Sequence, residues 1–464
     1  MNLEKENFGN DFHWGVATAA YQIEGAHETD GKGHSIWDEF SNKSKKIKDR
    51  TTGNIACDHY NRYKEDLDLI KQLNFANYRF SLAWSRIKPN GIGQTNQKGI
   101  DFYNRLIDNS LEIGLTPWVT LYHWDLPLAL QKKGGWINRD ILNWFGEYVE
   151  TSVMHFGDRV TNWMVMNEPM VFTGAGYFLG YHAPGKRGLM NFIPAMHHTA
   201  LAHGIGGRII RDLVPNAHIG STFSCSHIEP YSLHPRNVAA AQRFDALLNR
   251  LYIEPILGLG YPLATLPSLR KVEKFYQPND ESLLPFDFDF IGVQNYTREV
   301  VRHSWFVPYV SGKMINAAKR GKPTTTMGWE VYPESVYHML HQFAKYVAIK
   351  KLIITESGAA FPDHLNPEKE VTDHQRIDYF KDVLHQILKA KQEGISVNGY
   401  FIWTLLDNFE WSEGYTQRFG LVYNNHQHQE RIVKQSGLWF KNFLASTELK
   451  EILELEEKVR MPIA

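Results

Sequence analysis

The segment "KLIITESGAAF" (residues 351–361) joins a short apolar run to a carboxylate. Leu352, Ile353 and Ile354 have the apolar, β-branched character of a buried strand. Glu356 follows at once, although an unpaired carboxylate is costly to bury. A strand that ends on such a group indicates that the carboxylate is paired or used in chemistry.

Seven other segments share this strand character, and segments with helical spacing of apolar residues separate them, as in residues 64–73 and 374–394. The alternation predicts an α/β fold, a (β/α)₈ TIM barrel, and we expect residues 1–464 to form one domain. The alternative is a doubly wound sheet, but no G-x-G-x-x-G follows the first strand. The eight predicted strands begin at Phe12, Asn77, Thr116, Thr161, Ala217, Phe288, Leu352 and Gly399.

Polar and aromatic side chains follow several of these strands. In a barrel the carboxyl ends of the strands form the active-site face, so groups from distant segments would meet in one cleft. These residues are His123, Trp124, Asp125, Asn167, Glu168, Asn295, Tyr296, Glu356, Asp407, Asn408, Glu410 and Trp411.

The composition narrows the class of protein. A formal net charge of -1 gives no basic field for nucleic acid or an anionic membrane. The 2 cysteines, Cys57 and Cys225, are too few for a disulfide framework. No apolar run has the length of a signal peptide or a membrane span. We therefore expect a soluble, cytoplasmic protein. No His, Cys and Asp set has metal-ligand spacing, and we predict no metal. Aromatic residues make up 13%, including 13 Trp, which suits either a large core or stacking platforms for sugar faces.

Glu168 and Glu356 each follow a predicted strand, so both would lie at the same end of a barrel. Taken singly, Glu168 is compatible with a solvated strand-exit turn, and Glu356 with a structural ion pair to an arginine. Taken together, they match the two carboxylates about 5–5.5 Å apart that a retaining glycosidase uses. One would stay protonated, and a cation such as Arg79 would keep the other ionised.

Five separated motifs resemble those of one enzyme family. They are "FHWGVATAAYQIEGA" (residues 12–26), "LYHWDLP" (121–127), "MNEP" (166–169), "GWEVYPE" (328–334) and "NFEWSEGY" (408–415). In this order, and over nearly the whole chain, the sequence resembles glycoside hydrolase family 1, the β-glucosidase-like enzymes. The resemblance implies an exo-acting, retaining β-glycosidase, and within that class a β-glucosidase with some tolerance for β-galactosides or β-fucosides. It would act on small β-glycosides or short oligosaccharides without a cofactor, and it leaves the oligomeric state and the preferred leaving group open.

The resemblance also implies roles for individual residues. Glu168 is similar to the family's general acid/base and Glu356 to its nucleophile, which Arg79 and Tyr296 would orient and hold charged. Asn167 would bind the sugar 2-hydroxyl and Glu410 the 4- and 6-hydroxyls. The implied substrate-binding residues are Gln22, His123, Trp124, Asn167, Tyr296, Trp329, Trp403, Glu410 and Trp411, with Trp403 as the sugar's stacking floor and Trp329 as a platform for the leaving group.

Two positions depart from the pattern of the family. Ser357 follows Glu356 where the family usually has Asn, and Gln294 stands where it usually has Asn, two residues before Tyr296. Neither replaces a reacting group, so we expect them to affect fine specificity and rate. The segment 302–326 is basic and reads as an irregular loop over the barrel mouth.

Other functions remain as alternatives. A 6-phospho-β-glycosidase needs a cation for the phosphate, but the loop "NFEWSEGYTQRFG" has no Lys and carries Glu410. A sugar-binding relative without chemistry, or a thioglucosidase, would be expected to lack one of the two Glu residues. Transglycosylation uses the same covalent intermediate with a different acceptor and stays open.

Overall fold

The computed structural model describes residues 3–445, and eight of its strands close into a parallel barrel. Around the barrel the order is β1-β11-β10-β7-β5-β4-β3-β2, so the predicted TIM-barrel fold is confirmed. Almost every strand residue is buried, which suits parallel strands that are covered on both faces. The barrel strands are β1 (His13–Ala17), β2 (Asn77–Ser81), β3 (Thr116–Tyr122), β4 (Asn162–Asn167), β5 (His218–Ser224), β7 (Phe290–Gln294), β10 (Leu352–Ser357) and β11 (Val397–Trp403).

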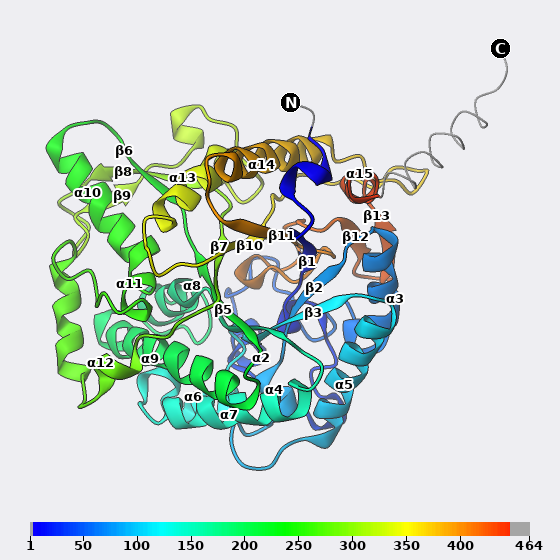
Figure 1. Ribbon diagram of the computed structural model, residues 1–464, viewed down its shortest axis with the longest axis horizontal. Coiled ribbons are helices and arrows are strands. Elements are labelled where there is room, and N and C mark those ends of the chain that lie inside the picture. The colour runs from blue at the N-terminus through cyan, green and yellow to red at the C-terminus, as the bar shows by residue number, and fades with distance from the viewer. Residues whose placement is uncertain (1–2, 446–464) are drawn as a thin grey trace.

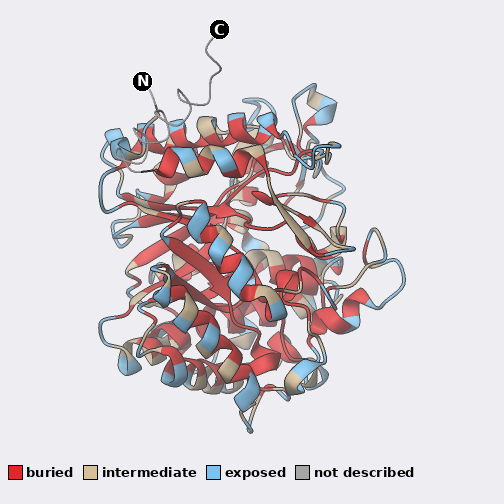
Figure 2. Ribbon diagram, turned by 90° about the vertical axis from the view of Figure 1, so that its right-hand side faces the viewer, coloured by how far each residue is buried: buried red, intermediate tan, exposed pale blue. Residues whose placement is uncertain are grey.

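Helices surround the barrel in the connections between its strands (Figure 1). The longer ones are α3 (His59–Gln72), α5 (Gln97–Glu112), α7 (Ile141–Phe156), α9 (Leu189–Leu213), α10 (Pro235–Asp245), α13 (Glu334–Phe343), α14 (His374–Gln392) and α15 (Gln435–Leu444). The shorter ones are α1 (Ala20–Ile23), α2 (Ile36–Ser41), α4 (Trp84–Ile87), α6 (Leu128–Lys132), α8 (Pro169–Thr173), α11 (Ile253–Ile256) and α12 (Asp280–Leu283). In Figure 2 the central strands are red, whereas the helices over them carry pale-blue, exposed stretches.

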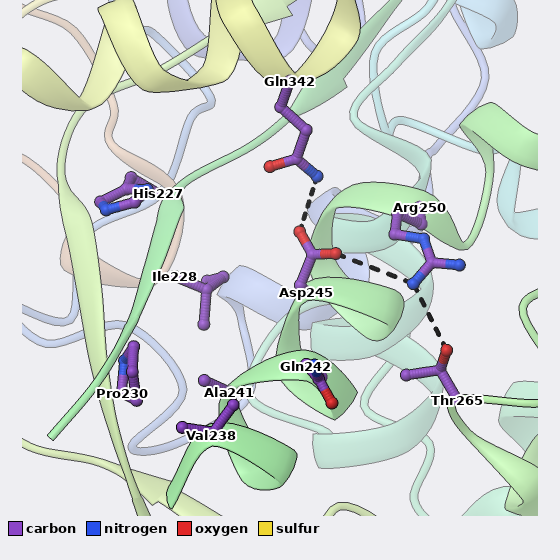
Figure 3. Close-up of a pocket in the computed structure, with 10 residues that line it drawn as sticks. All are labelled: His227, Ile228, Pro230, Val238, Ala241, Gln242, Asp245, Arg250, Thr265 and Gln342. Carbon is purple, nitrogen blue, oxygen red and sulfur yellow. Dashed lines mark hydrogen bonds and ion pairs between the residues drawn. The ribbon is translucent and has the colours of Figure 1, made fainter. Parts of the chain in front are cut away.

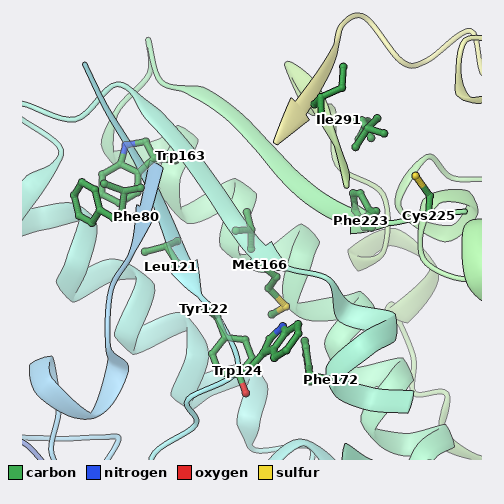
Figure 4. Packing of buried hydrophobic residues seen from close by; sticks show 14 of the residues in the cluster. Phe80, Leu121, Tyr122, Trp124, Trp163, Met166, Phe172, Phe223, Cys225 and Ile291 are labelled. Carbon is green, nitrogen blue, oxygen red and sulfur yellow. The ribbon is translucent and has the colours of Figure 1, made fainter. Parts of the chain in front are cut away.

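Buried apolar side chains form two clusters. The larger one lies between strands and helices, and Figure 4 shows part of it, where the rings of Tyr122 and Phe172 pack with centroids 5.2 Å apart. The smaller one fills the inside of the barrel. Its Trp118, on β3, contacts Phe290 on β7 and Phe401 on β11, at ring-centroid distances of 5.6 and 5.1 Å. These strands are not neighbours in the sheet, so such contacts must cross the barrel interior.

Two small sheets lie outside the barrel. One is the hairpin of β12 (Val422–Asn425) and β13 (Glu430–Val433), and the other joins β6 (His227–Pro230), β8 (Arg298–His303) and β9 (Gly312–Met314). The segment 302–326 is therefore not wholly irregular, because β9 pairs with β8 through Met314 and Val301. Its irregular composition hid a strand of only 3 residues.

The expected single domain includes residues 1–2 and 446–464, which lie outside the described residues. Within residues 3–445 no helix is long and apolar enough to cross a membrane. The same residues contain no group of three or more His, Cys, Asp or Glu side chains that could hold a metal ion.

Candidate active site

Glu356 lies near the carboxyl end of β10, only 3% exposed, and both oxygens of its carboxylate accept hydrogen bonds. Arg79 Nη1 donates to Oε1 at 2.5 Å, and the Tyr296 hydroxyl donates to Oε2 at 2.7 Å. Burial raises the pKa of Glu356, while the Arg79 charge and the Tyr296 hydrogen bond act in the opposite direction. The carboxylate is thus desolvated, yet it has a cation and a hydroxyl fixed on its two oxygens.

Glu168 stands where β4 ends and α8 begins. Its backbone is left-handed, with φ 44° and ψ 65°, and Pro169 occupies the first turn of the helix. Burial, and after it the charge of Glu356, raises the pKa of Glu168 well above the ordinary value. No guanidinium or ammonium group of the described residues is hydrogen-bonded to Glu168, so the first negative charge of the pair falls on Glu356.

Three residues near the same end of the barrel have a strained backbone. Trp124 has φ 81°, Glu168 has φ 44° and Trp411 has φ 47°, all in the left-handed region that side chains with a Cβ rarely adopt. Each such residue costs on the order of 1–3 kcal/mol, and the surrounding structure must offset this cost. The strained residues follow β3, β4 and β11, where they turn side chains toward the candidate site.

Asn167 is the hub of a buried hydrogen-bond network. Its Oδ1 accepts from Arg79 Nη2 at 2.5 Å, Thr222 Oγ1 at 2.8 Å and Gln294 Nε2 at 2.7 Å. Its Nδ2 faces His123 Nε2 at 2.9 Å. Burial lowers the pKa of His123 well below its ordinary value, so the imidazole is neutral and Nε2 accepts this bond.

Gln22 and Glu410 bring the segment after β11 against the first helix of the chain. Gln22 Nε2 lies 3.1 Å from Asn408 Oδ1, 3.0 Å from Phe409 O and 3.4 Å from Glu410 Oε2. Burial, together with the weaker effect of the Glu356 charge, raises the pKa of Glu410 to about 8. Glu410 is therefore mostly protonated near neutral pH in the free protein.

Aromatic rings line the candidate site. The rings of Trp124 and Trp411 are 4.5 Å apart, and His123 lies 5.8 Å from Trp411 and 6.0 Å from Trp403. On the other side Trp329 packs 5.4 Å from Tyr296. The arrangement combines polar groups with flat apolar faces, as a pyranose ring requires.

Several buried polar atoms of this site have no hydrogen-bond partner among the described residues. They include Gln22 Oε1, His123 Nδ1 and Gln294 Oε1. Buried polar atoms are normally paired, and an unpaired one is costly. Acceptors and a donor grouped in this way suit a ligand that brings several hydroxyls.

A hollow of about 430 Å³ lies elsewhere, between β6, α10 and α13 (Figure 3). Four of its polar side chains are paired with one another: Gln342 Nε2 donates to Asp245 Oδ1 at 2.7 Å, and Arg250 Nη1 to Thr265 Oγ1 at 3.4 Å. It lacks the carboxyl pair and the unpaired groups of the barrel end.

The structure brings all the predicted site residues to one end of the barrel, where Trp329 packs on Tyr296 and on the apolar cluster that contains Trp403. Sequence reasoning missed the contribution of β5. Thr222 joins the Asn167 network, and a hydrogen bond from Ser224 lowers the pKa of Glu168. Both residues lie at the carboxyl end of a predicted strand, so their position was the available signal.

Comparisons with known proteins identify the family of the chain. Residues 4–449 match the model of the family described as "Glycosyl hydrolase family 1". The chain is 44% identical to "Beta-glucosidase A" of Thermotoga maritima over 452 residues, covering 97% of this chain and 100% of the relative. It is 41% identical to "1,4-beta-D-glucan glucohydrolase" of Thermotoga neapolitana over 447 residues, covering 96% of this chain and 100% of the relative.

Solved structures are similar throughout the fold. The family 1 β-glucosidase of Thermotoga maritima superposes with a TM-score of 0.91 at 44% identity, covering 94% of this chain and 97% of that one. The same T. maritima enzyme has been solved in complex with deoxynojirimycin and with glucoimidazole, at TM-scores of 0.91 and 0.90. With the barrel, the paired glutamates and a family match over almost its full length, the chain belongs to glycosyl hydrolase family 1.

Proposed function

We propose that this protein is an exo-acting, retaining β-glucosidase with Glu356 as nucleophile and Glu168 as general acid/base. The observation that carries the assignment is the unequal environment of the two glutamates. Glu356 is bound by Arg79 and Tyr296, while burial and the charge of Glu356 keep the proton on Glu168. A retaining glycosidase needs one ionised and one protonated carboxyl group, about 5–5.5 Å apart.

The chemistry proceeds in two displacements. Glu356 attacks the anomeric carbon, while Glu168 gives its proton to the departing glycosidic oxygen, so a glycosyl ester forms and the leaving alcohol departs. Esterification removes the negative charge of Glu356, which lowers the pKa of Glu168. Glu168 then takes a proton from water, whose oxygen displaces Glu356, and the sugar leaves with its original anomeric configuration.

The remaining groups would hold the sugar. Asn167 binds the 2-hydroxyl, Glu410 the 4- and 6-hydroxyls, and Gln22 and His123 offer their unpaired atoms to further hydroxyls. Trp124 and Trp411 line this subsite, Trp403 stacks on the ring, and Trp329 supports the leaving group. The names of the relatives and the sugar-like inhibitors bound to one of them support glucosides or short oligosaccharides as substrates.

A 6-phospho-β-glycosidase is less compatible with the charges. Arg418 in the loop after β11 pairs with Asp407 at 2.8 Å, and Lys434 is buried between Asp363 and Asp407. Neither cation is free for a phosphate. Transfer to a sugar acceptor would use the same intermediate as hydrolysis.

We also propose a single catalytic domain and a cytoplasmic location. Both cysteines are free and buried, which is compatible with a reducing compartment.

The substrate is tested by comparing kcat/KM for 4-nitrophenyl β-D-glucoside, its 6-phosphate, the β-galactoside, the β-fucoside and cellobiose. We expect kcat/KM for the β-glucoside to exceed kcat/KM for its 6-phosphate by at least about tenfold. We also expect NMR to detect β-glucose as the first product. Preference for the 6-phosphate would overturn the substrate, and α-glucose as the first product would overturn the mechanism.

A further inference from the structure

Gln294 reaches across a strand to a residue of the proposed active site. It is the last residue of β7, and Asn167 is the last residue of β4, with β5 between them in the barrel. Gln294 Nε2 nevertheless lies 2.7 Å from Asn167 Oδ1, and 3.1 Å from Thr222 Oγ1 on the intervening strand. All three side chains are fully buried.

Thr222 depends on Gln294 for its orientation. The single hydroxyl hydrogen of Thr222 has two possible acceptors, Asn167 Oδ1 at 2.8 Å and Met166 O at 3.3 Å. When Thr222 Oγ1 accepts from Gln294, its hydrogen is directed to the shorter bond, on Asn167. Gln294 therefore acts on Asn167 twice, directly and through Thr222.

Arg79 alone cannot replace these contacts. Its guanidinium donates to Asn167 Oδ1 through Nη2 and to Glu356 Oε1 through Nη1. If the other two donors were lost, Arg79 alone would orient the amide oxygen while it also binds the nucleophile. Three donors on Oδ1 exclude a flipped amide, so Nδ2 is fixed on the opposite side.

We infer that Gln294 is a positioning residue that locks the Asn167 amide, with Nδ2 presented to the 2-hydroxyl of the substrate. The inference rests on the proposed function and concerns one of the two positions where this chain departs from the family's usual residue. Gln294 Oε1 is itself buried without a partner in the described structure, so the side chain is held by its donor end.

The test compares two substrates that differ only at the 2-hydroxyl. In Gln294→Met, which keeps the length of the side chain but removes the amide, we expect kcat/KM for the aryl β-glucoside to fall about tenfold. For the matching 2-deoxy-β-glucoside the fall should be clearly smaller, with each substrate normalised to the wild-type protein. A part of the loss is common to both substrates, because the hydrogen bond of Gln294 that lowers the pKa of Glu356 is removed as well. Gln294→Asn keeps an amide with shorter reach. It should also lose more kcat/KM on the β-glucoside than on the 2-deoxy substrate, with smaller losses than the Met variant. This second variant keeps the test usable if Gln294→Met does not fold.

The matched control is Gln429→Met, which removes another buried amide, one that bonds Ala56 O and lies outside the site. It should leave the ratio of the two kcat/KM values unchanged. Equal losses on both substrates, a larger loss on the 2-deoxy substrate, or no loss at all would overturn the positioning role. Failure of the proposed function is distinct, because the wild-type protein would then not hydrolyse the β-glucoside.

Discussion

At the scale of single residues, the two glutamates carry the same chemical group and differ only in their neighbours. Arg79 and Tyr296 hold the oxygens of Glu356, whereas burial and repulsion from Glu356 act on Glu168. Their protonation states are therefore consequences of packing.

The first prediction concerns Glu168→Gln. Activity should rise with pH as Glu356 ionises and fall again as Glu168, whose pKa is raised, loses its proton. The amide cannot titrate, so the variant should lose the alkaline fall in kcat/KM. Because a good leaving group needs little protonation, kcat/KM should drop less for a dinitrophenyl than for an alkyl β-glucoside. An unchanged alkaline limb would show that another group is the acid.

Asp125 provides a second prediction, for stability. Burial raises its pKa to about 8, and its Oδ1 has no partner in the described residues. In the unfolded chain the carboxyl group has its ordinary pKa of about 3.9. Between that pH and the folded pKa, the folded state therefore binds more protons than the unfolded state. Stability should therefore fall as pH rises from about 4 toward about 8.

Asp125→Asn should make this decline shallower, as measured by the thermal midpoint across that pH range. A remaining slope is expected, because the pKa values of Glu168 and Glu410 are raised too. A variant whose midpoint depends on pH as steeply as that of the wild-type protein would contradict the raised pKa of Asp125.

At the scale of elements, an ion-pair cluster fixes the segment that carries Trp329. Glu330 is 3% exposed and binds Arg298 Nη2 at 2.9 Å and Arg320 Nη2 at 2.5 Å. Arg298 begins β8, two residues after Tyr296. The cluster thus ties the proposed leaving-group platform to the strand end that supports the nucleophile.

Glu330→Gln should lower the free energy of unfolding by about 1–3 kcal/mol, because hydrogen bonds to charged groups are lost. The loss in kcat/KM should depend on the leaving group, since we propose that Trp329 supports that part of the substrate. The control is Lys350→Ala, which breaks the exposed pair with Asp287 and should cost at most about 1 kcal/mol. Equal kinetic losses for aryl and alkyl glucosides would contradict the platform role.

The sequence predicted the elements better than the contacts between them. All eight barrel strands were found because short runs of apolar residues end in polar groups, as in residues 351–361. The strand β9 was missed because its Lys313 and Met314 are exposed and its partner β8 begins 14 residues earlier, so no local pattern marks it. The Gln294–Asn167–Thr222 network was also missed, because it depends on the order of strands around the barrel.

At the scale of the whole molecule, the residues that pack the barrel interior differ from those of the proposed active site. Trp118 and its neighbours fill the interior, while Asn167 ends β4 and Arg79 reaches from the middle of β2 to Asn167 and Glu356. Trp118 Nε1 also donates to Asn77 Oδ1 at 2.9 Å.

Trp118→Ala should therefore destabilise the fold by about 3–5 kcal/mol through loss of packing. Trp305, which is 73% exposed, is the matched control, and Trp305→Ala should change stability by no more than about 0.5 kcal/mol. Denaturant unfolding measures both. Similar small effects of the two substitutions would contradict a packed barrel interior.

The central claim, that Glu356 forms a covalent bond with the sugar, is tested most directly by trapping the intermediate. An activated 2-deoxy-2-fluoro-β-glucoside, whose fluorine slows both steps and whose good leaving group preserves the first, should inactivate the protein with one sugar bound per chain. Peptide mass spectrometry should locate that sugar on Glu356, and Glu356→Gln should take up none. A sugar attached to another residue, or full turnover by Glu356→Gln, would contradict the account.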